Sequence, residues 1–137
     1  LTIPWCTYTD PEIAHVGLYE HEAAARGIEV DSYVQEFAHI DRAIAEGVDD
    51  GGFVKIHTAK GKDRILGATI VNRHAGEMIS EISVAMAARA GLGKLNDVIP
   101  PYPTQSEAIR ALGGAYLRTR LTPTVARLFE TLLRWSR

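Results

Sequence analysis

Apolar and polar residues alternate with a period of two in the middle of the chain, which predicts a β-hairpin. Residues 53–58 (Phe-Val-Lys-Ile-His-Thr) alternate in this way, and a polar turn containing Gly61 follows them. Residues 64–71 are apolar on both faces, so we expect this strand to be central in its sheet. Two further strands are predicted at 13–18 and 29–37. The first half of the chain is therefore mainly sheet-forming.

Helical patterns lie between and after these strands, at 20–26, 39–46, 75–90, from 104 onward and after 122. In 75–90 apolar residues recur every three or four positions, which predicts a helix. Thr104 to Glu107 has the S/T-x-x-E form of a capping box, so a helix is expected to begin there and end near Gly113. Thr122-Pro123 predicts the start of a C-terminal amphipathic helix. Strands followed by helices favour an α+β fold, an antiparallel sheet with helices packed on one side.

Composition fits one globular domain covering residues 1–137, with 46% apolar and 23% charged residues. A net charge of −2 predicts no nucleic-acid partner, and no apolar run reaches the roughly 20 residues of a membrane span. The single cysteine, Cys6, excludes an internal disulfide and suits a reducing, cytoplasmic location. Because the chain begins with Leu1, we expect it to be a piece of a longer polypeptide.

Few residues form a pattern that predicts chemistry. The five histidines never fall at metal-ligand spacing, so no metal site is predicted, and His15 and His57 are expected to be surface or hydrogen-bonded core residues. Gly91-Leu92-Gly93 follows a helix and is not a dinucleotide fingerprint. Cys6 is expected to be a small buried apolar residue.

The C-terminal stretch is basic and amphipathic. Its arginines flank an apolar face at positions 118, 120, 127, 134 and 137. Such a helix can lie on an anionic membrane, dock onto a partner subunit, or place cations at its own C-terminus. One hypothesis is therefore a stand-alone protein-interaction or membrane-surface module that uses this helix.

Six segments, in order, resemble the C-terminal domain of the flavin-dependent pyridine nucleotide–disulfide oxidoreductases, the group of lipoamide dehydrogenase, glutathione reductase and mercuric reductase. They are Pro11–Leu18, Asp41–Ala43, Gly52–Ile56, Ile65–Ala68, Ala75–Ile79 and Pro103–Glu107. The resemblance implies that the chain is the C-terminal dimerisation domain of an oxidoreductase. FAD and NAD(P)H would then bind mainly to two preceding domains of the same polypeptide, which this chain lacks. We expect a homodimer, and an isolated chain that is inactive and binds neither cofactor.

The same resemblance identifies candidate site residues. Tyr102 and Glu107 are the candidate catalytic residues, and the family's loop implies that Pro103 and Thr104 lie near the partner subunit's flavin. It also implies a cis peptide bond between Tyr102 and Pro103. Glu107 alternatively serves only as the N3 residue of the capping box.

Tyr102 stands where the family's disulfide reductases have a histidine. A phenol titrates near pH 10 and stays protonated at neutrality, whereas imidazole titrates near 6.5 and can exchange a proton. Tyrosine at this position resembles mercuric reductase, although the chain ends Arg134-Trp135-Ser136-Arg137 without that enzyme's cysteine pair. The hypothesis is thus a mercuric-reductase-like oxidoreductase in which a Tyr-Pro loop reaches the partner's flavin.

Overall fold

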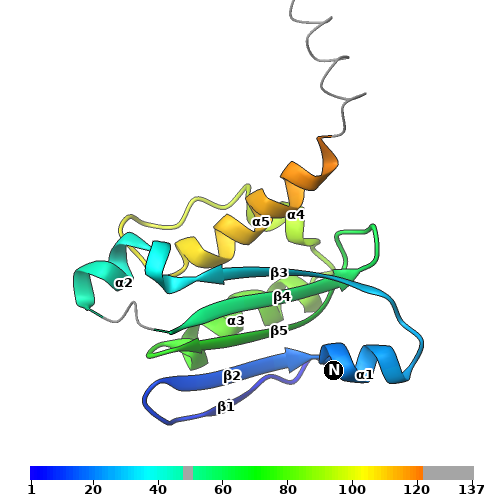
Figure 1. Cartoon of the computed structure of the whole chain (residues 1–137), viewed down its shortest axis with the longest axis horizontal. Helices are drawn as coiled ribbons and strands as arrows, with labels where there is room; N and C mark the ends of the chain where they lie inside the picture. The colour runs from blue at the N-terminus through cyan, green and yellow to red at the C-terminus, as the bar shows by residue number, and fades with distance from the viewer. Residues whose placement is uncertain (48–50, 122–137) are drawn as a thin grey trace, which may run out of the picture.

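A five-stranded antiparallel sheet forms the centre of the computed structural model, which describes residues 1–47 and 51–121 (Figure 1). The strands are β1 (Trp5–Thr7), β2 (Glu12–Gly17), β3 (Val30–Glu36), β4 (Phe53–Ala59) and β5 (Ile65–Asn72). Their order in the sheet is β1-β2-β5-β4-β3. The predicted hairpin is confirmed as β4 and β5, and β5 is central because it pairs with both β2 and β4.

The helical elements are α1 (Glu20–Ala25), η1 (Phe37–His39), α2 (Asp41–Glu46), α3 (Ala75–Ala87), α4 (Leu92–Leu95) and α5 (Glu107–Arg120). Together with the sheet they confirm the α+β class. The short helix α4 lies in a stretch that the sequence predicts only as a connector. The C-terminal helix predicted after Thr122 lies outside the described residues.

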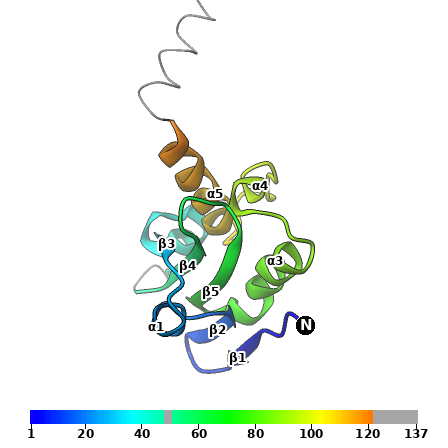
Figure 2. The ribbon, with the colours of Figure 1, turned by 90° about the vertical axis from the view of Figure 1, so that its right-hand side faces the viewer.

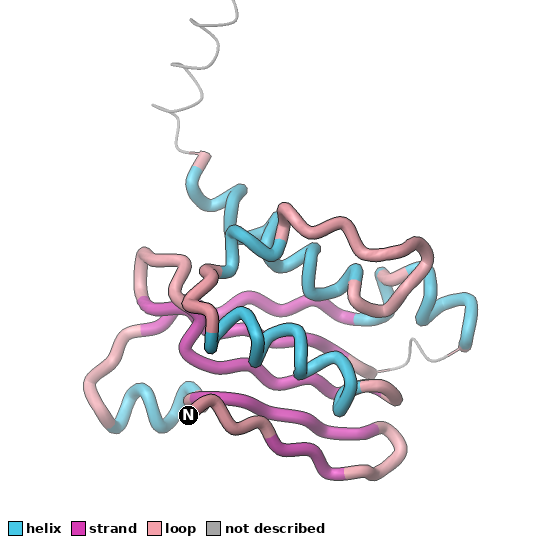
Figure 3. The backbone as a smooth tube through the Cα atoms, turned by 180° about the vertical axis from the view of Figure 1, so that it is seen from behind, coloured by secondary structure: helices cyan, strands magenta, loops and turns pink. Residues whose placement is uncertain are grey.

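One face of the sheet carries the hydrophobic core. The registers place Ala14, Ile70 and Val54 in one row across β2, β5 and β4. The side chains two residues further along each strand point to the same face. Ile82 of α3 and Ile109 of α5 are fully buried in the same cluster. Figures 2 and 3 show α3 and α5 on this side of the sheet, whereas α1 lies across the sheet from α3. Burying each large aliphatic side chain stabilises the fold by about 1.5–3 kcal/mol.

Helix α5 differs from its predicted boundaries. It begins at Glu107, with Ser106 as its N-cap residue, and continues through Gly113 to Arg120. A Cβ atom at Gly113 would lie 2.7 Å from the backbone nitrogen of Asn96. Gly113 therefore lies inside α5 and does not end the helix. Its missing side chain allows α5 to contact the α4 region closely.

Candidate functional site

The connection between α4 and α5 carries the candidate site. We call residues 100–106 the proline loop, because Pro100, Pro101 and Pro103 restrict its backbone. The Tyr102–Pro103 peptide bond is cis, as predicted, and the Tyr102 side chain is 71% exposed. A second cis bond, Asp10–Pro11, lies in a turn for which the sequence predicted no isomer.

Tyr102 is hydrogen-bonded to α2. Its hydroxyl donates to the Asp41 Oδ2 atom over 2.9 Å, and Asp41 is the first residue of α2. The hydrogen bond to the Asp41 carboxylate raises the pKa of Tyr102 above its ordinary value, with a smaller effect from Glu107. The phenol therefore remains protonated at neutral pH and acts as a donor.

A second contact joins the loop to the other end of α2. Gln105 is buried, and its Nε2 atom donates to Glu46 Oε2 over 2.7 Å. Arg42 forms an ion pair with Glu46 and, as the main cause, lowers the pKa of that carboxyl. The proline loop is thus attached to both the first and the last residue of α2.

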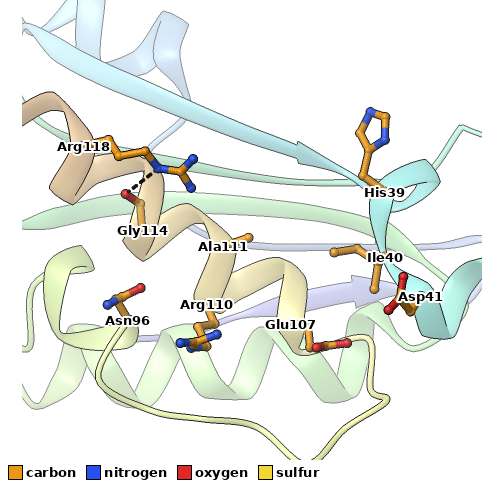
Figure 4. A pocket seen from close by; sticks show the side chains of 9 residues that line it. All are labelled: His39, Ile40, Asp41, Asn96, Glu107, Arg110, Ala111, Gly114 and Arg118. Carbon is orange, nitrogen blue, oxygen red and sulfur yellow. Dashed lines mark hydrogen bonds between the residues drawn. The ribbon is translucent and has the colours of Figure 1, made fainter.

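A polar groove of about 330 Å³ lies between α2 and α5 (Figure 4). Its lining residues are His39, Ile40, Asp41, Asn96, Glu107, Arg110, Ala111, Gly114 and Arg118. In this view the carboxylates of Asp41 and Glu107 lie toward one end, and Asn96 and Arg118 lie toward the other. The groove therefore combines carboxylates, guanidinium groups and, through Asp41, the Tyr102 hydroxyl.

The structure brings Tyr102 and Glu107 to the same region, and the hydrogen-bond partner of Tyr102 is Asp41. Among the described residues its hydroxyl bonds to Asp41 and not to Glu107. Sequence reasoning missed this role of Asp41, although Asp41-Arg42-Ala43 is one of the segments that resemble the family.

The predicted capping box is wrong. Thr104 makes no side-chain cap to α5, and its Oγ1 atom is buried without a partner in the described part of the chain. The reason is a turn over 104–106: the amide of Glu107 bonds to the Thr104 carbonyl over 3.4 Å, and that of Ala108 bonds to the Gln105 carbonyl over 3.1 Å. Glu107 is therefore the first helical residue and its side chain lines the groove.

An apolar groove of about 500 Å³ lies on the other side of the proline loop. Its lining residues are Glu81, Val84 and Ala85 of α3, Ala88 and Ala90 after α3, Lys94 and Leu95 of α4, residues 98–101, Thr104 and Ser106. Two of its large apolar side chains are open to water: Val84 is 67% exposed and Ile99 is 78% exposed. Burial raises the pKa of the Glu81 carboxyl, and the Ser106 hydroxyl partly offsets this effect.

Other sequence candidates have structural roles within the described residues. Cys6 is half-buried against the core, and burial raises the pKa of its thiol. Arg118 donates to the Gly114 carbonyl, and Arg120 donates to the Gly61 carbonyl. The remaining arginines of the basic stretch lie outside the described residues. No helix within 1–47 and 51–121 is both long enough and apolar enough to cross a bilayer.

Comparison with known proteins gives a consistent result. The family "Pyridine nucleotide-disulphide oxidoreductase, dimerisation domain" matches residues 3–112. A mercuric reductase of Shewanella putrefaciens is 38% identical over 109 residues, which are 80% of this chain and 19% of the relative. A dihydrolipoyl dehydrogenase of Bacillus subtilis is 41% identical over 107 residues, 78% of this chain and 22% of the relative.

A solved structure agrees with these relatives. The HOCl-induced flavoprotein disulfide reductase RclA from Escherichia coli superposes with a TM-score of 0.76 at 26% identity, over 82% of this chain and 26% of that one. The chain spans about a fifth of the length of the curated relatives named above. Because the match to this family covers most of its residues, the chain belongs to the dimerisation-domain family of the pyridine nucleotide-disulphide oxidoreductases.

Proposed function

We propose that this chain is the C-terminal dimerisation domain of a longer FAD-dependent NAD(P)H oxidoreductase and pairs with a second copy through its apolar groove. We call this surface, from α3 across residues 98–101, the dimer groove. One observation carries the proposal: the apolar side chains of Val84 and Ile99 are both exposed and line the same groove. Apolar side chains gathered in one groove are typical of an interaction surface. A twofold axis would place the same surface on both partners.

The proline loop then forms one wall of the interface and presents Tyr102 to the partner subunit's flavin site. The exposed phenol fits this role, because its proton is donated to Asp41 and its oxygen is left to accept a hydrogen bond from beyond its own domain. Pro103 and Thr104 follow in the same loop. FAD and NAD(P)H, when bound, supply hydride and electron transfer. All strand pairs described here are antiparallel, with no strand–glycine-rich turn–helix unit among the described residues, so the cofactors' pyrophosphates would be held by other domains.

Tyr102 favours a mercuric-reductase-like parent over a disulfide reductase that uses histidine at this position. A tyrosine with a raised pKa is a hydrogen-bond donor and a poor acid/base at neutral pH. Both kinds of relative match with similar identity, so this preference rests on Tyr102.

Sedimentation velocity of the 137-residue chain tests the proposed interface. We expect a dimer at tens of micromolar, and a monomer for Val84→Asp, since the new carboxylate would be buried without a partner. Val34→Asp is the matched control, because Val34 is 53% exposed but lies on β3, outside the groove. It should remain dimeric. A monomeric wild type, or a dimeric Val84→Asp, would contradict the proposed interface.

A further inference from the structure

Two buried histidines lie on the face of the sheet opposite the core. His15 in β2 and His57 in β4 are only 2% and 3% exposed. His15 is the register partner of Thr69, and His57 is the register partner of Gly67, both in the intervening strand β5. Neither histidine belongs to the candidate site, and both are covered by the segment that leads into α1.

Gly67 allows this segment to cross the sheet. A Cβ atom there would lie 2.1 Å from the carbonyl oxygen of Leu18, and the Leu18 amide bonds to the Leu66 carbonyl over 2.9 Å. The chain leaving β2 therefore passes directly over β5, which brings Tyr19 and Glu20 above the histidines.

The contacts of His15 place a proton on Nε2 and, in the neutral ring, leave Nδ1 as an acceptor. A carbonyl oxygen only accepts, so Nε2 donates to the Gly17 carbonyl over 3.1 Å, and Nδ1 accepts from the Thr69 hydroxyl over 2.9 Å. The ring stacks on Tyr19 with a centroid separation of 3.6 Å and an angle of 7° between the planes. The buried His15 ring thus packs directly against Tyr19, the residue that precedes α1.

His57 makes a comparable contact to the first residue of α1. Ser32 donates its hydroxyl proton to Glu20 Oε1 over 2.6 Å, so its oxygen must accept from His57 Nδ1 over 2.8 Å. Glu20 also forms an ion pair with Lys55. The chain Glu20–Ser32–His57 therefore links the start of α1 to β3 and β4.

We propose that α1 is a pH-sensitive latch, which neutral His15 and His57 hold against the sheet and which their protonation releases. The geometry provides the coupling, because both rings are almost completely covered by the segment at the start of α1. A positive charge on either ring therefore gains access to water only when this segment leaves the sheet. Its two turns have few other attachments: Ala23 is its one buried residue.

The charges around the histidines set the direction of the effect. Glu20 and Glu22 on α1 favour protonation, but Glu20 is already paired with Lys55 on β4. Burial is the largest effect and lowers the pKa of both rings, and the charges of Lys55 and His15 lower the pKa of His57 further. The exposed His21 stacks on Tyr19 from the outside, while Ser32 and Thr69 are the neutral groups that face the rings.

The sign follows from proton linkage. Because the folded-state pKa of each histidine is lowered, its stabilising contribution is complete above its ordinary pKa, near 6.5. It is lost as the pH falls from there through the folded-state value. Each histidine can weaken the latched state by up to about tenfold per pH unit in that range.

Amide hydrogen exchange of the 137-residue chain tests the latch, with rates divided by the intrinsic rate at each pH. The probe is the α1 amides, including Ala23, which bonds to the Tyr19 carbonyl. We expect their protection to fall about tenfold or more between pH 7.5 and 5 while β5 stays protected. The variant His15→Gln with His57→Gln should lose this pH dependence. His74→Gln, at an exposed histidine, is the control and should keep it.

A direct titration of the wild type by NMR keeps the test decisive if the double variant does not fold. Both buried rings should titrate below about 6.5 and show the predicted tautomers at pH 7.5. Titration at or above that value, or α1 protection that is independent of pH, would overturn the proposal. The same holds if α1 in the folded double variant loosens in acid as the wild type does.

Discussion

At the scale of single residues, removal of the Tyr102 hydroxyl tests whether the proline loop takes part in the reaction. Tyr102→Phe removes only the bond to Asp41 and leaves an exposed ring. We expect the chain to keep its melting temperature and dimer, while the parent enzyme loses about tenfold in kcat, the effect of one hydrogen bond of about 1.4 kcal/mol. Steady-state kinetics on the natural substrate measures this.

Two comparison variants separate chemistry from packing. Asp41→Asn keeps an acceptor for the Tyr102 hydroxyl, so it should retain more activity than Tyr102→Phe. Tyr102→His introduces a group that titrates near neutrality and should raise activity toward disulfide substrates, because it can protonate a departing thiolate. Unchanged kinetics in Tyr102→Phe would leave Tyr102 as a packing residue.

The sequence identifies Tyr102 and Pro103 because three nearby prolines mark the loop and the family resemblance explains it. It does not identify Asp41 as the partner, since 61 positions separate the two residues and only the packing of α2 brings them together. Thr104 shows the opposite failure. Its spacing to Glu107 satisfies the capping pattern, yet a turn over 104–106 delays the helix and breaks the pattern's geometry.

At the scale of elements, the contact between α4 and α5 depends on one of two adjacent glycines. Gly113→Ala would place its Cβ 2.7 Å from the Asn96 nitrogen and 2.9 Å from the Leu92 carbonyl, so the helices must separate. We expect a loss of about 1–3 kcal/mol in the free energy of unfolding, as for other overpacked sites. Urea unfolding followed by circular dichroism measures it.

Gly114→Ala is the matched control for that contact. Its Cβ would meet only side-chain ends, the nearest being Asn96 Oδ1 at 3.2 Å. Alanine is favoured over glycine within a helix by about 0.5–1 kcal/mol, so this variant should be neutral or more stable. Equal effects of the two substitutions would contradict the close-approach explanation.

The glycine pair also shows why helix ends are hard to predict. Adjacent glycines are typical of a helix end, so the sequence predicted that the helix ends near Gly113. The need for small residues at Gly113 comes from α4, which was itself predicted only as a connector. The hairpin of β4 and β5 was predictable because its period-two pattern depends on nothing outside the two strands.

At the scale of the whole molecule, each face of the sheet has a different use. The inner face holds the core beneath α3 and α5, and the outer face holds the histidines beneath α1. The proline loop lies between two grooves: a polar one that contains Asp41 and Glu107, and the apolar dimer groove. The sequence predicted the sheet and the loop, but both grooves arise where three or more segments meet, which no local pattern encodes.

Glu81 makes the proposed dimer dependent on pH. Its carboxyl lines the dimer groove, where burial raises its pKa, and a second copy would remove more of its water. The pKa of Glu81, already raised in the monomer, would then be higher still in the dimer. Glu81 therefore opposes assembly least below the monomer's value, and opposes it increasingly as the pH rises through the dimer's value. The dimer of the wild type should therefore weaken from pH 5 to 7.5.

Glu81→Gln keeps the shape of the side chain and a partner for Ser106 but removes the charge. We expect its dimer to bind about tenfold more tightly than the wild type at pH 7.5, and the difference to shrink at pH 5. Sedimentation equilibrium at both pH values measures the two dissociation constants. The histidine latch is present in both proteins, so its effect cancels in their ratio. Glu77→Gln, on the exposed side of α3, should match the wild type at both pH values. A ratio that does not change with pH would mean that the Glu81 carboxyl is not buried by the second copy, and would move the interface away from this part of α3.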